Sequence, residues 1–287
     1  MNKFFPILLL LIIPNISHAC TVTSGVVTNT NDSTCYTQPD YYSIKLFKLY
    51  LCTSEPGEPT TSSTADLSAC HILAEGGSSG ITVTLEDTSS STILSGGTYT
   101  RVPDGVYTHA YIRLDNVISL KMDKEFENSS VGATGGTGKY CATVTGSGDE
   151  KVREISGSSV CSSSDNLTAG IWTSTMNEFG TNGSANAGSN KVSLSGINGK
   201  DINMDIFLIA TDGKRVDVNA DRNTVDYFEA TQSFASPIVI EREKLKTLNL
   251  AVGISMGIAV WDPTSGATNK MEFSPGPFVT DISVTNY

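Results

Sequence analysis

The longest regular pattern in the chain is an alternation of large apolar residues with small or polar ones over Thr247–Trp261. The large apolar positions are Leu248, Leu250, Val252, Ile254, Met256, Ile258 and Val260. A period of two places all seven on one face of a β-strand, whereas a helix would scatter them around its axis. One unbroken strand would reach roughly 45 Å, which is unusually long. We therefore expect a β protein here, with a bend or bulge at Gly253 and Gly257.

Shorter runs elsewhere repeat the strand signal between turn residues. Ser43–Cys52 is largely apolar at both alternating sets of positions, which predicts a central strand. Asp212-Gly213 separates Asp201–Ala210 from Lys214–Val218 and is a hairpin signal. About twelve to fourteen strands and no long helix predict an all-β fold, an antiparallel β-sandwich with disulfide-stapled loops. The sequence allows one large sandwich or two packed sandwiches.

A low-complexity stretch at 180–189 suggests a division of the chain. We expect an N-terminal β-rich, disulfide-containing region at 20–178 and a C-terminal β-sandwich region at 190–287. The alternative is that both regions form one continuous domain.

Residues 1–19 have the three parts of a secretory signal peptide. Lys3 is the single charge, Phe4–Ile13 is apolar, and small residues precede an expected cleavage site after Ala19. The apolar run has about half the length of a membrane-spanning helix, and no later stretch is apolar enough to span. We expect export to the periplasm, the outer cell surface or the medium. A lipid anchor on Cys20 is disfavoured, because the preceding residues match the bacterial lipoprotein pattern only at Ala19.

The six cysteines indicate a disulfide framework in an oxidising compartment. Spacing alone does not choose among the connectivities, but each sequential pair brackets a polar, turn-rich segment. We therefore expect bonds between neighbours in the sequence, Cys20–Cys35, Cys52–Cys70 and Cys141–Cys161. A zinc site is the competing interpretation, and it is disfavoured because no C-x-x-C motif occurs.

The charge balance excludes one class of partner. The net charge is −11 and the isoelectric point is about 4.7. Removal of the signal peptide takes away Lys3 and leaves 18 Lys and Arg against 30 Asp and Glu, a net charge of −12. Sequence-independent nucleic-acid binding needs a basic face, so we expect no nucleic-acid partner.

Four residues form the most suggestive set for ligand binding. Tyr107, His109, Tyr111 and Arg113 alternate along the expected strand Val106–Leu114 and so share one face. Such a face can stack on a sugar ring or anchor a protein, because aromatic residues offer large contact area at little entropy cost. The simpler interpretation, which we favour, is a solvated sheet face. Its opposite face would be a core made of Val106, Ala110, Ile112 and Leu114.

The acidic segment after residue 216 resembles the first half of a calcium-binding loop. Oxygen-bearing side chains with the required spacing are Asp217, Asn219, Asp221 and Asn223. Arg222 stands where this loop needs glycine, and Phe228 stands where it needs a bidentate acid. A calcium site of different geometry, using Asp226 or Glu229, is the alternative to turn residues between two strands.

No coherent catalytic set is visible. Only His71 and His109 remain after the signal peptide, and a Gly-x-Ser-x-Gly motif is absent. Glycosidase chemistry needs two carboxylates with different pKa values, and nothing distinguishes one pair among thirty acids. We therefore expect no enzyme, with a polysaccharide-active enzyme as the third-ranked function.

One short segment resembles a known family. Pro103-Asp104-Gly105-Val106-Tyr107 leads from a turn into a strand. It resembles the "PxGxY" segment of secreted prealbumin-like and immunoglobulin-like β-sandwich proteins of Gram-negative bacteria. The resemblance covers about twenty residues from Gly96 and implies a sandwich fold, with no catalytic residue carried over.

These observations predict an exported, non-enzymatic β-sandwich protein that acts as a structural, adhesive or filament-forming component of the cell surface. The strand-like ends Thr21–Thr30 and Phe278–Val284 are of the kind that can complete a neighbour's sheet. Self-association by strand addition, or binding to a surface glycan or protein, is the expected partnership. The alternative is a carbohydrate- or calcium-dependent binding module.

Overall fold

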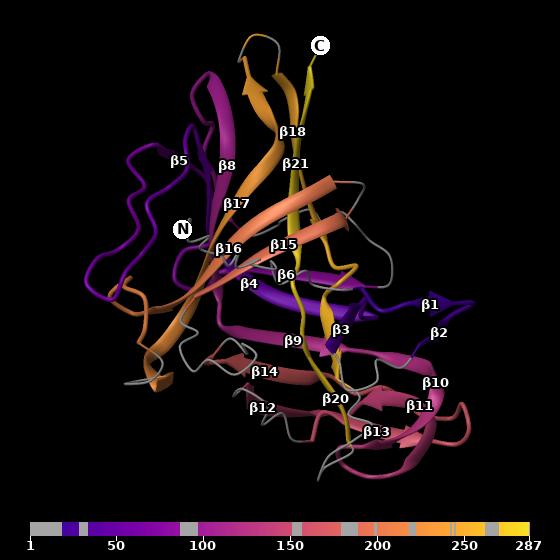
Figure 1. The fold of residues 1–287 in the computed structure, drawn as a ribbon. Coiled ribbons are helices and arrows are strands. Elements are labelled where there is room, and N and C mark those ends of the chain that lie inside the picture. Colours follow the sequence, from indigo (N-terminus) through magenta and orange to yellow (C-terminus); the bar gives the residue numbers. More distant parts are fainter. Residues whose placement is uncertain are drawn as a thin grey trace, which may run out of the picture.

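Strands make up most of the structure. The computed structural model describes residues 19–28, 34–86, 97–150, 157–178, 189–197, 200–217, 222–241, 243, 245–261 and 270–286. Within these ranges the helical structure is a single 3₁₀ turn at Arg222–Thr224. The expected all-β fold is confirmed, and Figure 1 shows how the strands are arranged. The predicted signal peptide lies outside the described residues except for Ala19.

The largest sheet has eleven strands. Its main order is β12-β14-β9-β4-β8-β17-β16-β15, with β5, β6 and β7 joined through β4 and β5. The bounds are β4 Tyr41–Cys52, β5 Cys70–Glu75, β6 Ile81–Glu86, β7 Thr98–Tyr99, β8 Gly105–Asp115, β9 Val117–Lys121, β12 Gly146–Glu150, β14 Trp172–Met176, β15 Ser189–Ile197, β16 Lys200–Ala210 and β17 Val225–Ile240.

Two further sheets complete the described part of the chain. The eight-stranded sheet contains β1 Val22–Thr23, β2 Val26–Val27, β3 Thr34–Thr37, β10 Asp123–Gly132, β11 Thr137–Thr143, β13 Ser159–Ser162, β19 Ile258–Trp261 and β20 Lys270–Pro275. A two-stranded ribbon joins β18 Leu245–Gly253 to β21 Val279–Asn286. Most pairs are antiparallel, and β2 with β10, β10 with β20, and β12 with β14 are parallel.

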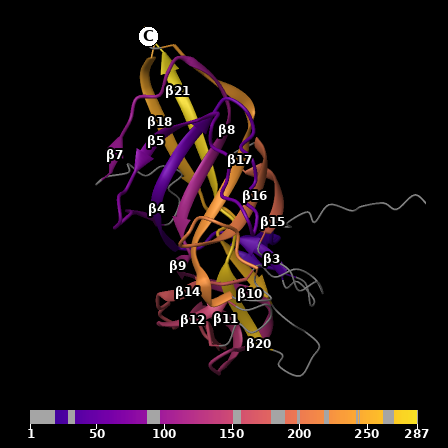
Figure 2. The same cartoon turned by 90° about the vertical axis from the view of Figure 1, so that its left-hand side faces the viewer.

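The sheets pack in layers, as a sandwich requires. Val252 and Ile254, with Ile282 of β21, share one core with Ile112 of β8 and Phe228 of β17. Figure 2 shows the ribbon as a separate layer beside β8 and β17. At the other end of the molecule the eight-stranded sheet packs on β9 and β14 around a second core that includes Phe126, Trp172 and Phe273. The predicted β-sandwich is confirmed.

The long alternating run, Thr247–Trp261, contributes strands to two different sheets. Val252, Ile254, Met256, Ile258 and Val260 are all buried, as the pattern predicts. The side chains of Leu248 and Leu250 lie outside the described part. The run does not form one straight strand: β18 ends at Gly253 and a turn follows, in which the amide of Gly257 donates to the carbonyl of Ile254 at 2.8 Å. The expected bend at the two glycines is confirmed, and β19 continues in the other sheet.

The central strand β4 contains an irregularity that explains its two apolar faces. Leu46 stands opposite Leu114, but Lys48 stands opposite Arg113, so Phe47 is an extra residue. The extra residue reverses the alternation, and both Leu46 and Leu49 face the core.

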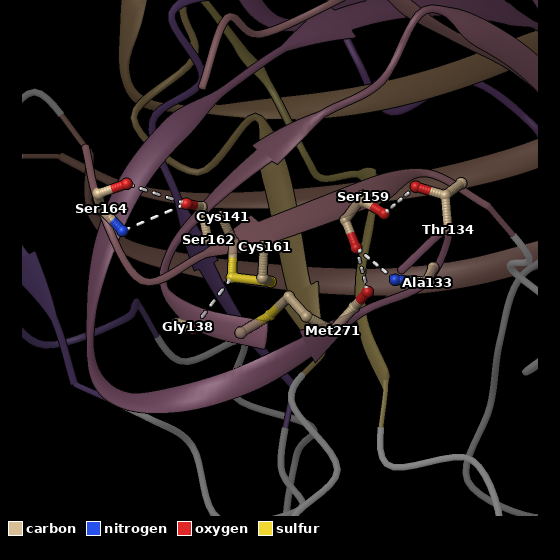
Figure 3. The surroundings of a disulfide bond; sticks show 9 residues. All are labelled: Ala133, Thr134, Gly138, Cys141, Ser159, Cys161, Ser162, Ser164 and Met271. Atoms are coloured by element: carbon tan, nitrogen blue, oxygen red, sulfur yellow. Dashed lines mark hydrogen bonds between the residues drawn. A yellow bond between two sulfur atoms is a disulfide. The ribbon is translucent and has the colours of Figure 1, made fainter. Parts of the chain in front are cut away.

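The disulfides follow the predicted sequential order, Cys20–Cys35, Cys52–Cys70 and Cys141–Cys161. Figure 3 shows the surroundings of Cys141–Cys161, which joins directly opposite residues of β11 and β13. Next to it, Ser159 donates from Oγ to the carbonyl of Met271 and accepts from the amide of Ala133 at 3.0 Å. These bonds tie β13 to β20 and to the turn after β10.

Strands from before and after the low-complexity stretch are hydrogen-bonded to one another. In the large sheet β8 pairs with β17, and in the eight-stranded sheet β3 pairs with β19 and β10 with β20. The described residues contain no helix that is long and apolar enough to cross a membrane.

Candidate functional site

The four predicted ligand-binding residues all lie on β8, but they do not share one face. His109 stands opposite Ser233 and Tyr107 opposite Ile238, so residues 234–237 of β17 bulge opposite a single residue of β8. Tyr107 is fully buried in the core, and its hydroxyl donates to the carbonyl of Pro103 at 2.8 Å. Val106, predicted to be in the core, is 51% exposed. Across Thr108, the residue opposite this bulge, the core side of β8 changes from Ala110 to Tyr107, so the expected placement of Tyr107 and Val106 was wrong.

Tyr111 and Arg113 do share a face, where they bind the carboxylate of Glu229. The Arg113 Nε donates to Glu229 Oε1 at 2.7 Å, a second guanidinium nitrogen contacts the same oxygen, and the Tyr111 hydroxyl donates to Oε2. Arg113 and Glu229 are directly opposite in β8 and β17, which brings their side chains together. Both carboxylate oxygens are therefore occupied within the chain.

Aromatic rings surround this cluster. The Arg113 guanidinium lies over the ring of Tyr227 at 5.3 Å from its centroid, and Tyr50 meets Tyr111 edge to face at 6.2 Å. Glu229 is buried, Tyr111 is 1% exposed and Arg113 is 29% exposed. The solvated face that we favoured is thus wrong for Tyr111, which is an internal residue.

A strap, defined here as residues 53–69, is anchored beside this face. The Cys52–Cys70 bond closes its base, and Gly57 and Asp66 exchange two backbone hydrogen bonds of 3.1 Å across it. Pro56 and Pro59 are buried. A short turn after β16 holds the strap, because the amide of Arg215 donates to the carbonyl of Thr60 at 3.0 Å and Thr64 pairs with Lys214.

The turn after β16 is the predicted Asp212-Gly213 hairpin. Gly213 has a φ of +81°, and its amide donates to the carbonyl of Ala210 at 2.9 Å. A Cβ at Gly213 would lie 3.1 Å from Thr64 and 3.7 Å from Arg113, so this turn fits between the strap and the cluster. The returning segment makes only short bridges, and the long antiparallel neighbours of β16 are β15 and β17.

Burial is the main cause of the pKa shifts of Tyr111 and His109. It raises the pKa of Tyr111 far above its usual range, and the neighbouring Glu229 carboxylate adds to the rise. Burial also lowers the pKa of His109, against an opposing effect of Glu55. His109 lies apart from the carboxylate, and its Nδ1 is 2.9 Å from the hydroxyl of Thr108.

The structure does not bring the calcium candidates together. Glu229 is bound by Tyr111 and Arg113, and Asp226, an exposed residue of β17, accepts a hydrogen bond from Thr211. Asp217 and Asn223 are exposed, while Asn219 and Asp221 lie outside the described residues. Among the described residues no group of three or more metal-ligating side chains occurs.

The two strand-like ends have different surroundings. At the N-terminal end β1 and β2 form a hairpin, and β2 pairs with β10 of the same chain. At the C-terminal end β21 pairs with β18, and this ribbon is hydrogen-bonded to no other described strand. The open edges of the ribbon are therefore the second candidate site.

The residue that our sequence reasoning missed is Glu229 as the partner of Tyr111 and Arg113. An acid and an arginine at matching positions of two strands were the available signal, but the register of β8 against β17 is not readable from composition. Comparison with family models, curated proteins and solved structures finds no match to this chain.

Proposed function

We propose that this protein is an exported, non-enzymatic structural component of the cell surface, of the adhesive or filament-forming kind, which assembles through exposed sheet edges. The observation that carries the proposal is the β18–β21 ribbon. Its strands have nine and eight residues, and among the described strands each pairs only with the other.

Unpaired strand edges present rows of amide donors and carbonyl acceptors, which another chain can use to extend the sheet. A two-stranded ribbon is marginal alone, and three or more strands make a stable sheet. Addition of a strand from a neighbour would therefore stabilise the ribbon as well as join two molecules.

The remaining features suit a scaffold in an oxidising environment. Three disulfides are characteristic of such a compartment, and each constrains the unfolded chain. The most suggestive ligand-binding side chains, Tyr107 and Tyr111, are packed inside the protein. This burial favours a structural role over a carbohydrate-binding module that uses the same face.

The test has two parts. In the first, light scattering of the processed chain, purified from an exporting Gram-negative host, is expected to report dimers or larger assemblies. In the second, protease added to intact cells of that host is expected to degrade the protein. A strictly monomeric chain at high concentration would contradict the proposal. Binding in a calcium titration or on a glycan array would favour the binding module, and release of reducing ends from a polysaccharide would favour an enzyme.

A further inference from the structure

The described edge strands differ in how well they could accept another strand. β1, β3, β7 and β12 have two, four, two and five residues, and β6 has six and ends in Glu86. β15 is long but carries Lys191 and a register shift, and the part of β17 beyond Ser233 contains Pro237. Short length, lysine, proline and bulges all oppose strand addition.

In β18 these protections are confined to one end of the strand. β21 lies close to β17 on one side and pairs with β18 on the other. This arrangement leaves the far edge of β18 facing away from both. Like β15, β18 has nine residues, one charged residue, Lys246, and one register shift, and it has no proline. Both the lysine and the shift lie at the start of β18, so its pairing is regular from Thr247 to Gly253, whereas that of β15 is regular from Ser189 to Leu194. β18 is therefore the long described edge with the least protection against addition.

Only the centre of β18 is symmetrical in sequence. Leu248 and Leu250 flank Asn249, whereas the outer mirror pairs differ: Thr247 with Ala251, Lys246 with Val252, and Leu245 with Gly253. In an antiparallel pair related by a two-fold axis at Asn249, each residue stands opposite its mirror position in the second copy. Asn249 then meets Asn249, Leu248 meets Leu250, and the two Lys246 residues lie near opposite ends. A parallel pair would place Lys246 beside Lys246.

We propose that β18 is the edge at which a second copy of this chain docks, antiparallel and with its two-fold axis at Asn249, to form a continuous four-stranded sheet β21-β18-β18-β21. This inference rests on the proposed function, because it assigns the edge and the register through which the protein self-associates. In this register both copies use the same residues, as a two-fold interface requires, and the two Lys246 charges are kept apart.

The experiment compares N249K, N249D and their equimolar mixture by sedimentation velocity of the processed chain. Each variant alone places like charges opposite each other at the axis, so we expect its dimer Kd to rise at least about tenfold. The mixture places Lys opposite Asp and is expected to restore association. The matched controls N190K and N190D change the same residue type on the edge strand β15 and are expected to leave the Kd within about twofold.

The outcomes separate the two proposals. Recovery in the mixture excludes misfolding of the single variants and supports both edge and register. If N249K and N249D both associate like the wild type, the assignment of β18 is overturned, whereas the proposed self-association is not. Loss of association in both variants without recovery in the mixture overturns the two-fold register. A wild-type chain that never associates overturns the proposed function together with this inference.

Discussion

At the scale of single residues, the carboxylate of Glu229 holds together parts of the chain that are far apart in sequence. It is buried on β17 and is bound by Arg113 and Tyr111 of β8. Arg113 in turn lies beside the Gly213 turn that holds the strap. The cluster therefore couples the register of β8 and β17 to the position of a surface loop.

Removal of Glu229 should be strongly destabilising. In Glu229→Ala the Arg113 guanidinium loses its partner in a largely buried site, which typically costs about 3–5 kcal/mol. Asp226→Ala on the same strand is the control, because Asp226 is exposed and should change stability by about 0.5 kcal/mol or less. Urea unfolding of both variants measures the difference, and equal effects would contradict an internal clamp.

The buried phenols predict a loss of stability in alkali. Burial raises the pKa of Tyr111, and burial likewise raises the pKa of Tyr42. Tyrosines of the unfolded chain ionise at about pH 10. The contribution of the buried phenols to the free energy of unfolding is therefore complete below that pH. Above it the contribution declines, because the native state keeps protons that the unfolded state loses. Unfolding free energies between about pH 8 and pH 11 should fall less steeply for Tyr111→Phe than for the wild type. Parallel curves would contradict this assignment.

At the scale of elements, the strap depends on the disulfide at its base. The Cys52–Cys70 bond closes a loop with a sequence separation of 18, which predicts a contribution of about 3 kcal/mol from chain entropy. We expect the double variant Cys52→Ser, Cys70→Ser to lose about this amount. In this variant the backbone amide of Arg215 should also exchange its hydrogen faster, because the disulfide no longer holds the strap that carries its acceptor, the carbonyl of Thr60. Exchange at Arg215 that matches the wild type would show that the strap is held without the bond.

Element types were predictable from sequence to the extent that local chemistry decides them. Alternation over Thr247–Trp261 identified a buried β face and the glycine bend, and the polar segments between neighbouring cysteines favoured the correct pairs. Extra residues in a strand were not predictable. Phe47 in β4 and residues 234–237 in β17 each shift the alternation, and their positions are set by the neighbouring strand. Val106 turns outward beside the bulge in β17. Tyr111 keeps the predicted face with Arg113 and is buried there by Glu229 and Tyr50, contacts that the alternation does not reveal.

At the scale of the whole molecule, the sheets connect the two halves of the chain. β17 lies between β8 and β16, so neither 20–178 nor 190–287 contains a complete large sheet. We expect calorimetry of the processed chain to give one cooperative transition, and separately expressed halves to remain unfolded. Two well-separated transitions, or a folded half, would contradict this shared core.

Assembly should respond to salt because the chain carries a net charge of −11, which becomes −12 if the predicted signal peptide is removed. Two such molecules repel each other, and added salt screens exposed charges. We expect the dimer Kd to fall as salt rises from about 0.01 M to about 0.15 M, a range over which the screening length shortens about fourfold. Weaker association at the higher salt would contradict an uncharged strand edge as the main contact.

The most direct measurement for the assembly account is amide hydrogen exchange of the processed chain as a function of protein concentration. The outward amides of β18, Leu245–Gly253, should exchange more slowly as concentration rises, because a second copy covers them. The amides of the edge strand β15, Ser189–Ile197, should be unaffected. Exchange in β18 that is the same at every concentration would contradict the central claim that this edge joins two molecules.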